Sequence, residues 1–177
     1  MSRRRVALSV GFPPVADARA RVLVLGSLPG RRSLEMQEYY AQPQNAFWRI
    51  MGELVGATPS LPYQARLTRL RASRIAVWDV LAAGERKGSL DSAIVPASIV
   101  VNDFATFFVQ HPRIRLICFN GQKAAAVFRR EVLPRVPLES IERRVMPSTS
   151  PAYASLRFDQ KLDLWAAALA PLLDARA

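Results

Sequence analysis

Short segments typical of strands alternate along the chain with longer segments whose apolar residues recur at helical spacing. The strand candidates are residues 21–25, 75–81, 114–119 and 139–146, and the helix candidates are 33–40, a segment from 45, 63–72, 98–109, 122–131 and 158–173. Strands that alternate with helices pair in parallel and are covered by helices on both faces. The pattern therefore predicts a three-layer α/β/α fold with a central four-stranded parallel sheet.

The remaining segments are predicted to be irregular. Residues 1–20 are expected to form a basic lead-in without regular structure, because Pro13-Pro14 blocks strand pairing. Residues 82–92 are predicted as a polar loop, and Ser33 as the N-cap of the first helix. No repeat or long linker divides the chain, so we expect a single domain over residues 1–177.

Polar or turn-forming residues follow the end of each predicted strand. They are residues 26–30, Asp79, Asn120-Gly121 and residues 147–151. The carboxyl ends of parallel strands lie along one edge of a sheet, which is where open α/β sheets bind ligands. The sequence thus predicts a site at this edge.

The charge balance indicates the kind of partner. The chain has 25 Lys and Arg residues against 14 Asp and Glu, a net charge of +11. Clustered arginines bind nucleic acid by releasing its counterions. A chain rich in arginine and alanine could also place arginine on solvated helix faces, so the charge favours nucleic acid without identifying it.

Several classes of protein do not fit the composition. The single cysteine, Cys118, excludes an internal disulfide framework, and one cysteine with one histidine argues against a zinc site. No metal or cofactor is expected. No apolar run approaches the ~20 residues of a membrane span, and no hydrophobic signal core follows the arginines at 3–5. We expect a cytoplasmic, nucleoid-associated monomer that binds no membrane.

Aromatic and amide side chains are concentrated in one stretch that follows the first predicted strand. They are Tyr39, Tyr40, Gln42, Gln44, Asn45, Phe47 and Trp48. Aromatic faces beside amide groups are suited to a flat, polar, uncharged ring such as a nucleobase.

Four motifs resemble, in order, those of the DNA-deoxyinosine (hypoxanthine-DNA) glycosylases, a branch of the uracil-DNA glycosylase superfamily. They are Gly26-Ser-Leu-Pro-Gly30 with Ser33-Leu34, Tyr39-Tyr40 and Pro43-x-Asn45-x-Phe47-Trp48; Trp78-Asp-Val-Leu81 with Gly88-Ser-Leu-Asp91; Phe119-Asn-Gly121; and Pro147-Ser-Thr-Ser-Pro151-Ala152. The resemblance spans about residues 22–154. It implies metal-free hydrolysis of the N-glycosidic bond of a deaminated nucleotide in double-stranded or single-stranded DNA, with hypoxanthine, uracil or xanthine as the base.

The resemblance implies a role for three side chains at the strand ends. Asn45 would be the catalytic residue, with a neutral amide that holds the attacking water; the alternative is a helix N-cap. Asp79 would accept a hydrogen bond from N1–H of hypoxanthine, or would cap a loop or pair with Arg86. Asn120 would contact the base edge, or form an ordinary Asn-Gly turn.

Further positions are implied to hold the base and the DNA backbone. Tyr40 is expected to stack on the flipped base, with Phe47 or Tyr39 as alternatives. The other implied base contacts are Gly26, Ser27 and Leu28. The implied DNA contacts are Pro29, Gly30, Arg31, Arg32, Gln42, Ser148, Thr149, Ser150, Pro151, Ala152 and Tyr153, of which the last two would fill the gap left by the base.

The sequence departs from the family pattern at three positions. Gln42 and Met146 stand where relatives usually carry a histidine, and Leu28 stands where the mismatch-specific uracil glycosylases carry an asparagine. Stabilisation of the leaving base would then fall to backbone dipoles, to Gln42 or to protonation of the purine at N7.

Two other functions are compatible with the residues. A binding module could have kept the fold and lost catalysis, but it would have no need of a neutral amide at Asn45. A small-molecule nucleotide enzyme could use residues 26–30 for phosphate, but this turn lacks both the lysine of a P-loop and the G-x-G-x-x-G pattern. The sequence therefore favours a monofunctional DNA glycosylase.

Overall fold

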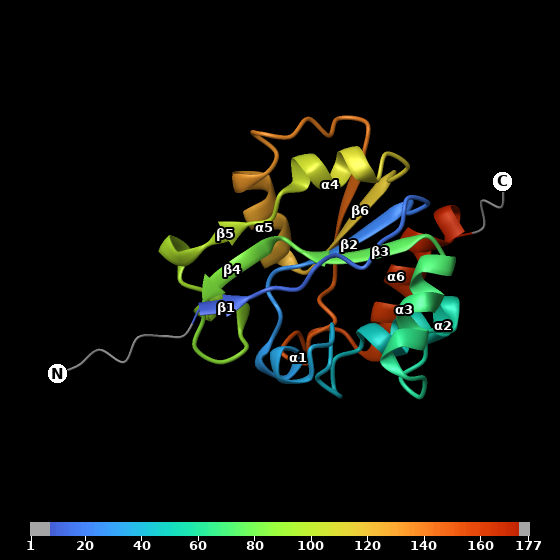
Figure 1. The fold of residues 1–177 in the computed structure, drawn as a ribbon. Helices are drawn as coiled ribbons and strands as arrows, with labels where there is room; N and C mark the ends of the chain where they lie inside the picture. Colours follow the sequence, from blue (N-terminus) through green and yellow to red (C-terminus); the bar gives the residue numbers. More distant parts are fainter. Residues whose placement is uncertain (1–7, 174–177) are drawn as a thin grey trace.

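The computed structural model describes residues 8–173, so the arginines predicted to form a basic arm at 3–5 lie outside the described residues. Its centre is a parallel sheet of strand order β3-β2-β6-β7 (Figure 1). The strands are β2 (Val22–Gly26), β3 (Ile75–Asp79), β6 (Leu116–Asn120) and β7 (Glu142–Met146). Every residue of β2, β3 and β6 is buried, as expected for strands covered on both faces.

Helices cover both faces of this sheet. Figure 1 shows α2 (Phe47–Val55), α3 (Tyr63–Ala72) and α6 (Phe158–Leu173) on one side, and α4 (Phe104–Gln110) and α5 (Gln122–Glu131) on the other. A short helix, α1 (Arg31–Met36), follows the first turn. The predicted three-layer architecture is confirmed. None of the helices within residues 8–173 is long and apolar enough to cross a bilayer.

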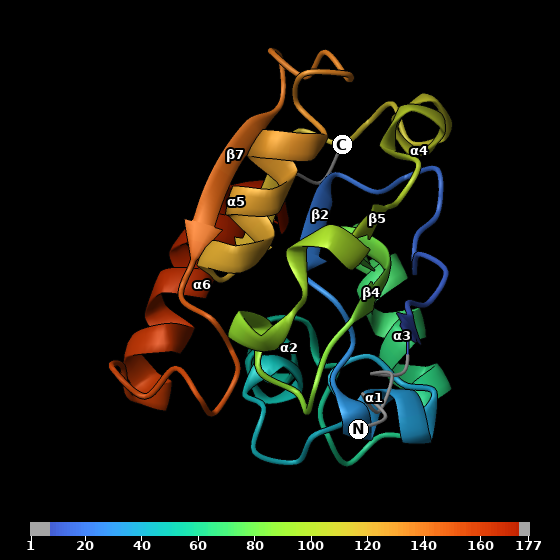
Figure 2. The same cartoon turned by 90° about the vertical axis from the view of Figure 1, so that its left-hand side faces the viewer.

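The structure also contains a second, antiparallel sheet, which the sequence pattern does not predict. It has the order β1-β4-β5 and consists of β1 (Leu8–Val10), β4 (Leu81–Glu85) and β5 (Val100–Val101), beside the parallel sheet (Figure 2). The prediction of a loop at 82–92 is wrong for the residues that belong to β4, and the prediction of an irregular lead-in is wrong for the residues of β1. β1 and β5 are too short to show a local pattern, and β4 consists mainly of Ala and Gly, so pairing between distant segments decides where these strands form.

Two other helix predictions are corrected by the structure. The helix predicted at 98–109 begins only at Phe104, where the Asp103 carboxylate caps it by accepting from the backbone N–H of Thr106 at 3.1 Å. Ser33 is not an N-cap, because Gly30 occupies that position. Ser33 lies buried inside α1.

Candidate functional site

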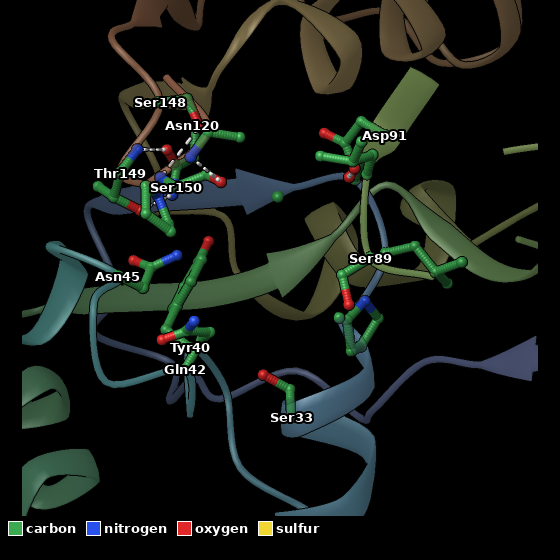
Figure 3. Close-up of a pocket in the computed structure, with 18 of the residues that line it drawn as sticks. Ser33, Tyr40, Gln42, Asn45, Ser89, Asp91, Asn120, Ser148, Thr149 and Ser150 are labelled. Atoms are coloured by element: carbon green, nitrogen blue, oxygen red, sulfur yellow. Dashed lines mark hydrogen bonds between the residues drawn. The ribbon is translucent and has the colours of Figure 1, made fainter. Parts of the chain in front are cut away.

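A pocket of about 520 Å³ opens at the carboxyl edge of the parallel sheet (Figure 3). Its floor lies where β2 and β3 end side by side, with Gly26 paired to Asp79. The pocket brings together most of the residues singled out in the sequence. These are Gly26, Ser27, Leu28, Pro29, Gly30, Arg32, Tyr40, Gln42, Asn45, Asp79, Asn120, Ser148, Thr149, Ser150, Pro151, Ala152 and Tyr153.

The turn at 26–30 is held by a buried arginine on the second sheet. The Arg86 guanidinium donates to the carbonyl oxygens of Leu28 and Pro29 and forms an ion pair with Asp91 at 3.6 Å. Asp91 in turn accepts from the Ser27 hydroxyl at 2.5 Å. Because the carbonyls of the turn are bonded on this side, its orientation at the pocket wall is fixed. No sequence pattern predicts this role of Arg86, since an arginine in a polar segment is ordinarily solvated.

Gly26 allows two polar groups to approach the end of β2. A Cβ atom at this position would lie 2.5 Å from Asp79 Oδ1 and 3.1 Å from the Tyr40 hydroxyl oxygen. Any side chain would therefore displace the carboxyl or the phenol from the pocket floor.

Tyr40 presents its ring to the pocket with support from behind. Its backbone has φ 54°, in the left-handed region that non-glycine residues rarely adopt. The ring stacks on Phe47 with centroids 4.1 Å apart. Phe47 is fully buried, so it supports Tyr40 from below and cannot itself contact a base, as one of our alternatives required. Tyr39, the other alternative, contributes to the pocket lining, but its side chain is buried and its hydroxyl donates to the Pro13 carbonyl at 3.0 Å.

Asn45 lies at the pocket wall immediately before helix α2. Its Oδ1 accepts from the backbone N–H of Phe47 at 3.0 Å, while Ala46 occupies the N-cap position. The amide nitrogen of Asn45 is turned toward Tyr40 (Figure 3). The N-cap alternative for Asn45 is therefore wrong as stated, although its side chain does accept a bond from the first residue of the helix while its amide nitrogen faces the pocket.

The rim of the pocket carries exposed polar side chains. Arg32 lines the pocket, whereas Arg31 lies beside it, and both approach the Glu35 carboxylate, at 3.7 and 3.6 Å. Gln42 lines the rim and accepts from the backbone N–H of Gln44 at 2.7 Å.

Asn120 fixes the loop that follows β7. Its amide donates to the Thr149 hydroxyl and accepts from the Thr149 backbone N–H, both at 2.9 Å. The Thr149 carbonyl accepts from the backbone N–H of Ala46 at 2.9 Å. Thr149 is 1 % exposed, so its hydroxyl anchors the loop and is not available to the DNA phosphate that the sequence assigned to it. Asn120 is likewise more than a turn residue.

Helix α6 holds the same loop from the other side. The Trp165 indole donates to the Pro147 carbonyl at 3.1 Å, and the buried Lys161 ammonium donates to the Tyr153 carbonyl at 2.7 Å. Burial lowers the pKa of Lys161. These contacts keep the loop in one shape and leave the Tyr153 ring 38 % exposed. No local pattern marks Lys161, because its partners are backbone carbonyls.

Asp79 is the buried acid of the pocket floor. It is 4 % exposed, and its Oδ2 has no hydrogen-bond partner among the described residues. Burial and the negative charge of Asp91 together raise the pKa of Asp79 to about 7, against the opposing effect of Arg86. The neutral, protonated carboxyl is therefore accessible near neutral pH. Within residues 8–173, no group of three or more His, Cys, Asp or Glu side chains could hold a metal ion.

A three-layer parallel sheet with an aromatic face, an amide and a buried carboxyl at its carboxyl edge defines a class of α/β enzymes that bind a flat ligand there. Comparison with known proteins specifies the class. The family model of the uracil DNA glycosylase superfamily matches residues 13–172, and the chain belongs to this superfamily.

Individual relatives are similar over most of their length. The chain is 42% identical to a hypoxanthine DNA glycosylase of Methanosarcina acetivorans and 38% identical to one of Methanosarcina barkeri, in each case over 80% of this chain and 86% of the relative. A solution NMR structure from Methanosarcina acetivorans, provisionally described as a uracil DNA glycosylase, is 36% identical with a TM-score of 0.77. That match covers 94% of this chain and 99% of the other.

Proposed function

We propose that this protein is a monofunctional DNA glycosylase that removes a deaminated base, hypoxanthine foremost, from double-stranded DNA. The observation that carries the proposal is the pocket itself, in which the Tyr40 ring, the Asn45 amide and the Asp79 carboxyl surround one cavity. Membership of the superfamily supports a DNA substrate. The names of the two Methanosarcina relatives favour hypoxanthine.

The chemistry needs few groups. The nucleotide leaves the stack, and its base enters the pocket against the Tyr40 ring. The C1′–N9 bond breaks with its electron pair going to the base, water held by Asn45 adds to C1′ and loses a proton to solvent, and the base anion takes up a proton from solvent. The products are the free base and an abasic site. A neutral amide is sufficient for this water, because bond breaking precedes attack and little basicity is required.

DNA would be held around the pocket mouth. Arg32, Ser148 and Ser150 line the mouth and are suited to phosphate contacts, which position DNA without reading its sequence. The exposed ring of Tyr153 could occupy the gap left by the base. The net charge of +11 supports a polyanionic partner.

The test is single-turnover excision on duplexes with one deoxyinosine or one deoxyuridine, in EDTA, with alkali to reveal abasic sites. We expect excision of hypoxanthine, and we expect Asn45→Ala to reduce its rate by at least about 100-fold with DNA affinity retained. Gln44→Ala is the matched control, since it removes a neighbouring, exposed amide outside the pocket lining.

Two outcomes would contradict the proposal. Excision by Asn45→Ala at the rate of the parent would remove the catalytic assignment. Salt-sensitive DNA binding without excision of either base would favour a binding module of the same fold.

A further inference from the structure

The buried polar atoms without partners gather around the pocket floor. Within residues 8–173 they are the Tyr40 hydroxyl oxygen, Asp79 Oδ2 and Arg86 Nε. The first two both approach the position that a Cβ atom of Gly26 would take, and Arg86 is close enough to Asp79 for each to shift the pKa of the other. A native protein rarely leaves such atoms unpaired. Tyr40 and Asp79, unlike Arg86, line the open cavity, which indicates that a ligand in the cavity completes their hydrogen bonds.

The surroundings of Asp79 compensate its charge only in part, through the nearby Arg86. The guanidinium that would pair with it, Arg86, is bonded to two carbonyls of the turn at 26–30 and paired with Asp91. The titratable and charged groups that face Asp79 or shift its pKa are Tyr39, Tyr40, Arg86 and Asp91. Both tyrosine hydroxyls are neutral because burial raises their pKa values. The protonated carboxyl is therefore well populated near neutral pH.

Deaminated bases share one edge that a neutral carboxyl matches. Deamination converts an amino group beside a ring nitrogen into a carbonyl beside a ring N–H, as at O6 and N1–H of hypoxanthine. A neutral carboxyl offers one acceptor and one donor in a plane, so it can pair with both groups. A carboxylate offers acceptors only, so it would face the O6 oxygen with a like charge.

The same pairing becomes stronger during the reaction. When the C1′–N9 bond breaks, its electron pair enters the base, and negative charge grows on O6. A hydrogen bond donated to O6 is then stronger in the transition state than in the ground state, which is the requirement for catalysis.

We propose that Asp79 acts as a neutral acid, donating a hydrogen bond to the carbonyl oxygen of the lactam base and accepting one from the adjacent ring N–H. Asp79 is then both a specificity-determining and a catalytic residue. It stabilises the leaving base in a pocket whose lining contains no histidine among the described residues. This inference rests on the proposed function.

The experiment follows single-turnover excision of hypoxanthine, at saturating enzyme, from about pH 5.5 to about pH 8.5. We expect the rate of the wild type to fall as the pH rises through about 7, because Asp79 loses the proton that it donates. Asp79→Asn keeps one donor and one acceptor but does not titrate, so we expect measurable excision with a flat pH profile. Asp79→Ala should lose about 100-fold in rate.

Two controls separate this role from a structural one. Asp17→Asn changes an exposed aspartate that pairs with Arg19 and should keep the wild-type profile. Circular dichroism and DNA affinity at each pH show whether a loss of rate comes from the chemical step. If Asp79→Ala does not fold, the comparison of Asp79→Asn with the wild type decides.

The outcomes distinguish the two proposals. A wild-type rate that rises through pH 7 and a flat profile for Asp79→Asn would identify an acceptor carboxylate and overturn the inference. A fall with pH shared by the wild type and Asp79→Asn would overturn it as well. Absence of excision by the wild type at every pH would contradict the proposed function itself.

Discussion

The pocket floor and the loop after β7 differ in how they treat buried polar groups. In the loop, Thr149 has its hydroxyl, N–H and carbonyl all bonded within the protein, to Asn120 and Ala46. On the floor, the Tyr40 hydroxyl oxygen and Asp79 Oδ2 have no partners among the described residues. The difference fits two tasks under the proposed function. The loop would be fixed before DNA arrives, whereas the floor would keep its hydrogen-bonding capacity for the base.

Like the loop after β7, the turn at 26–30 is held by hydrogen bonds within the protein. Removing the bonds from Arg86 should cause the largest loss in the free energy of unfolding. Arg86→Met leaves the carbonyls of Leu28 and Pro29 unpaired, together with the half-exposed Asp91. We expect a loss of about 3 kcal/mol in the free energy of unfolding, with excision impaired because the turn moves. Urea denaturation measures the first effect, and Lys87→Met is the exposed control. A loss below about 0.5 kcal/mol, the range of surface changes, would show that Arg86 does not brace the turn.

Releasing the loop after β7 should cost less. Asn120→Ala removes two hydrogen bonds and leaves Thr149 buried with unpaired groups, so we expect a loss of about 2 kcal/mol in the free energy of unfolding. DNA affinity should fall as well, because the loop loses its fixed shape. Denaturation and a DNA titration at fixed salt measure the two effects. Unchanged stability would mean that the loop holds its shape without Asn120.

A change at the floor should stabilise the protein instead of destabilising it, by an amount that depends on pH. Burial raises the pKa of Asp79 from its ordinary value of 3.8 to about 7. The folded state therefore binds this proton more tightly than the unfolded state, and stability falls as the pH rises from about 4 to about 7. Asp79→Asn should remove this decline, so its advantage over the wild type should grow across that interval and stay constant above it. Denaturation at about pH 4.5 and about pH 7.5 checks the sign.

The parts of the fold and site that the sequence predicted have strong local patterns. Val22 to Leu25 form an uninterrupted apolar run, and a glycine-rich turn ends it, so the first strand and the site edge were both visible. The antiparallel sheet was not visible, because Leu8–Val10 pairs with residues more than seventy positions away along the chain and has no pattern of its own. The role of Lys161 is not predicted from the sequence for a related reason. Its partner is a backbone carbonyl, which every residue has, so no residue type marks the contact.

Phe47 shows the limit of motif-based reasoning. It lies in the strongest motif, and its aromatic ring made it a candidate for the base. In the structure, Phe47 is fully buried and stacks against the side of Tyr40 that faces away from the pocket. When neighbouring positions are also aromatic, their spacing alone does not show which ring is buried.

The contacts of α6 also have a consequence for biosynthesis. Trp165 and Lys161 belong to the last element of the chain that the structure describes, yet they hold a loop that is made earlier. A chain still attached to the ribosome can contain all four parallel strands before this helix emerges. We therefore expect the loop after β7 to be fixed only when synthesis has passed Trp165, so that shorter nascent chains would contain the sheet but lack the loop conformation proposed to bind DNA.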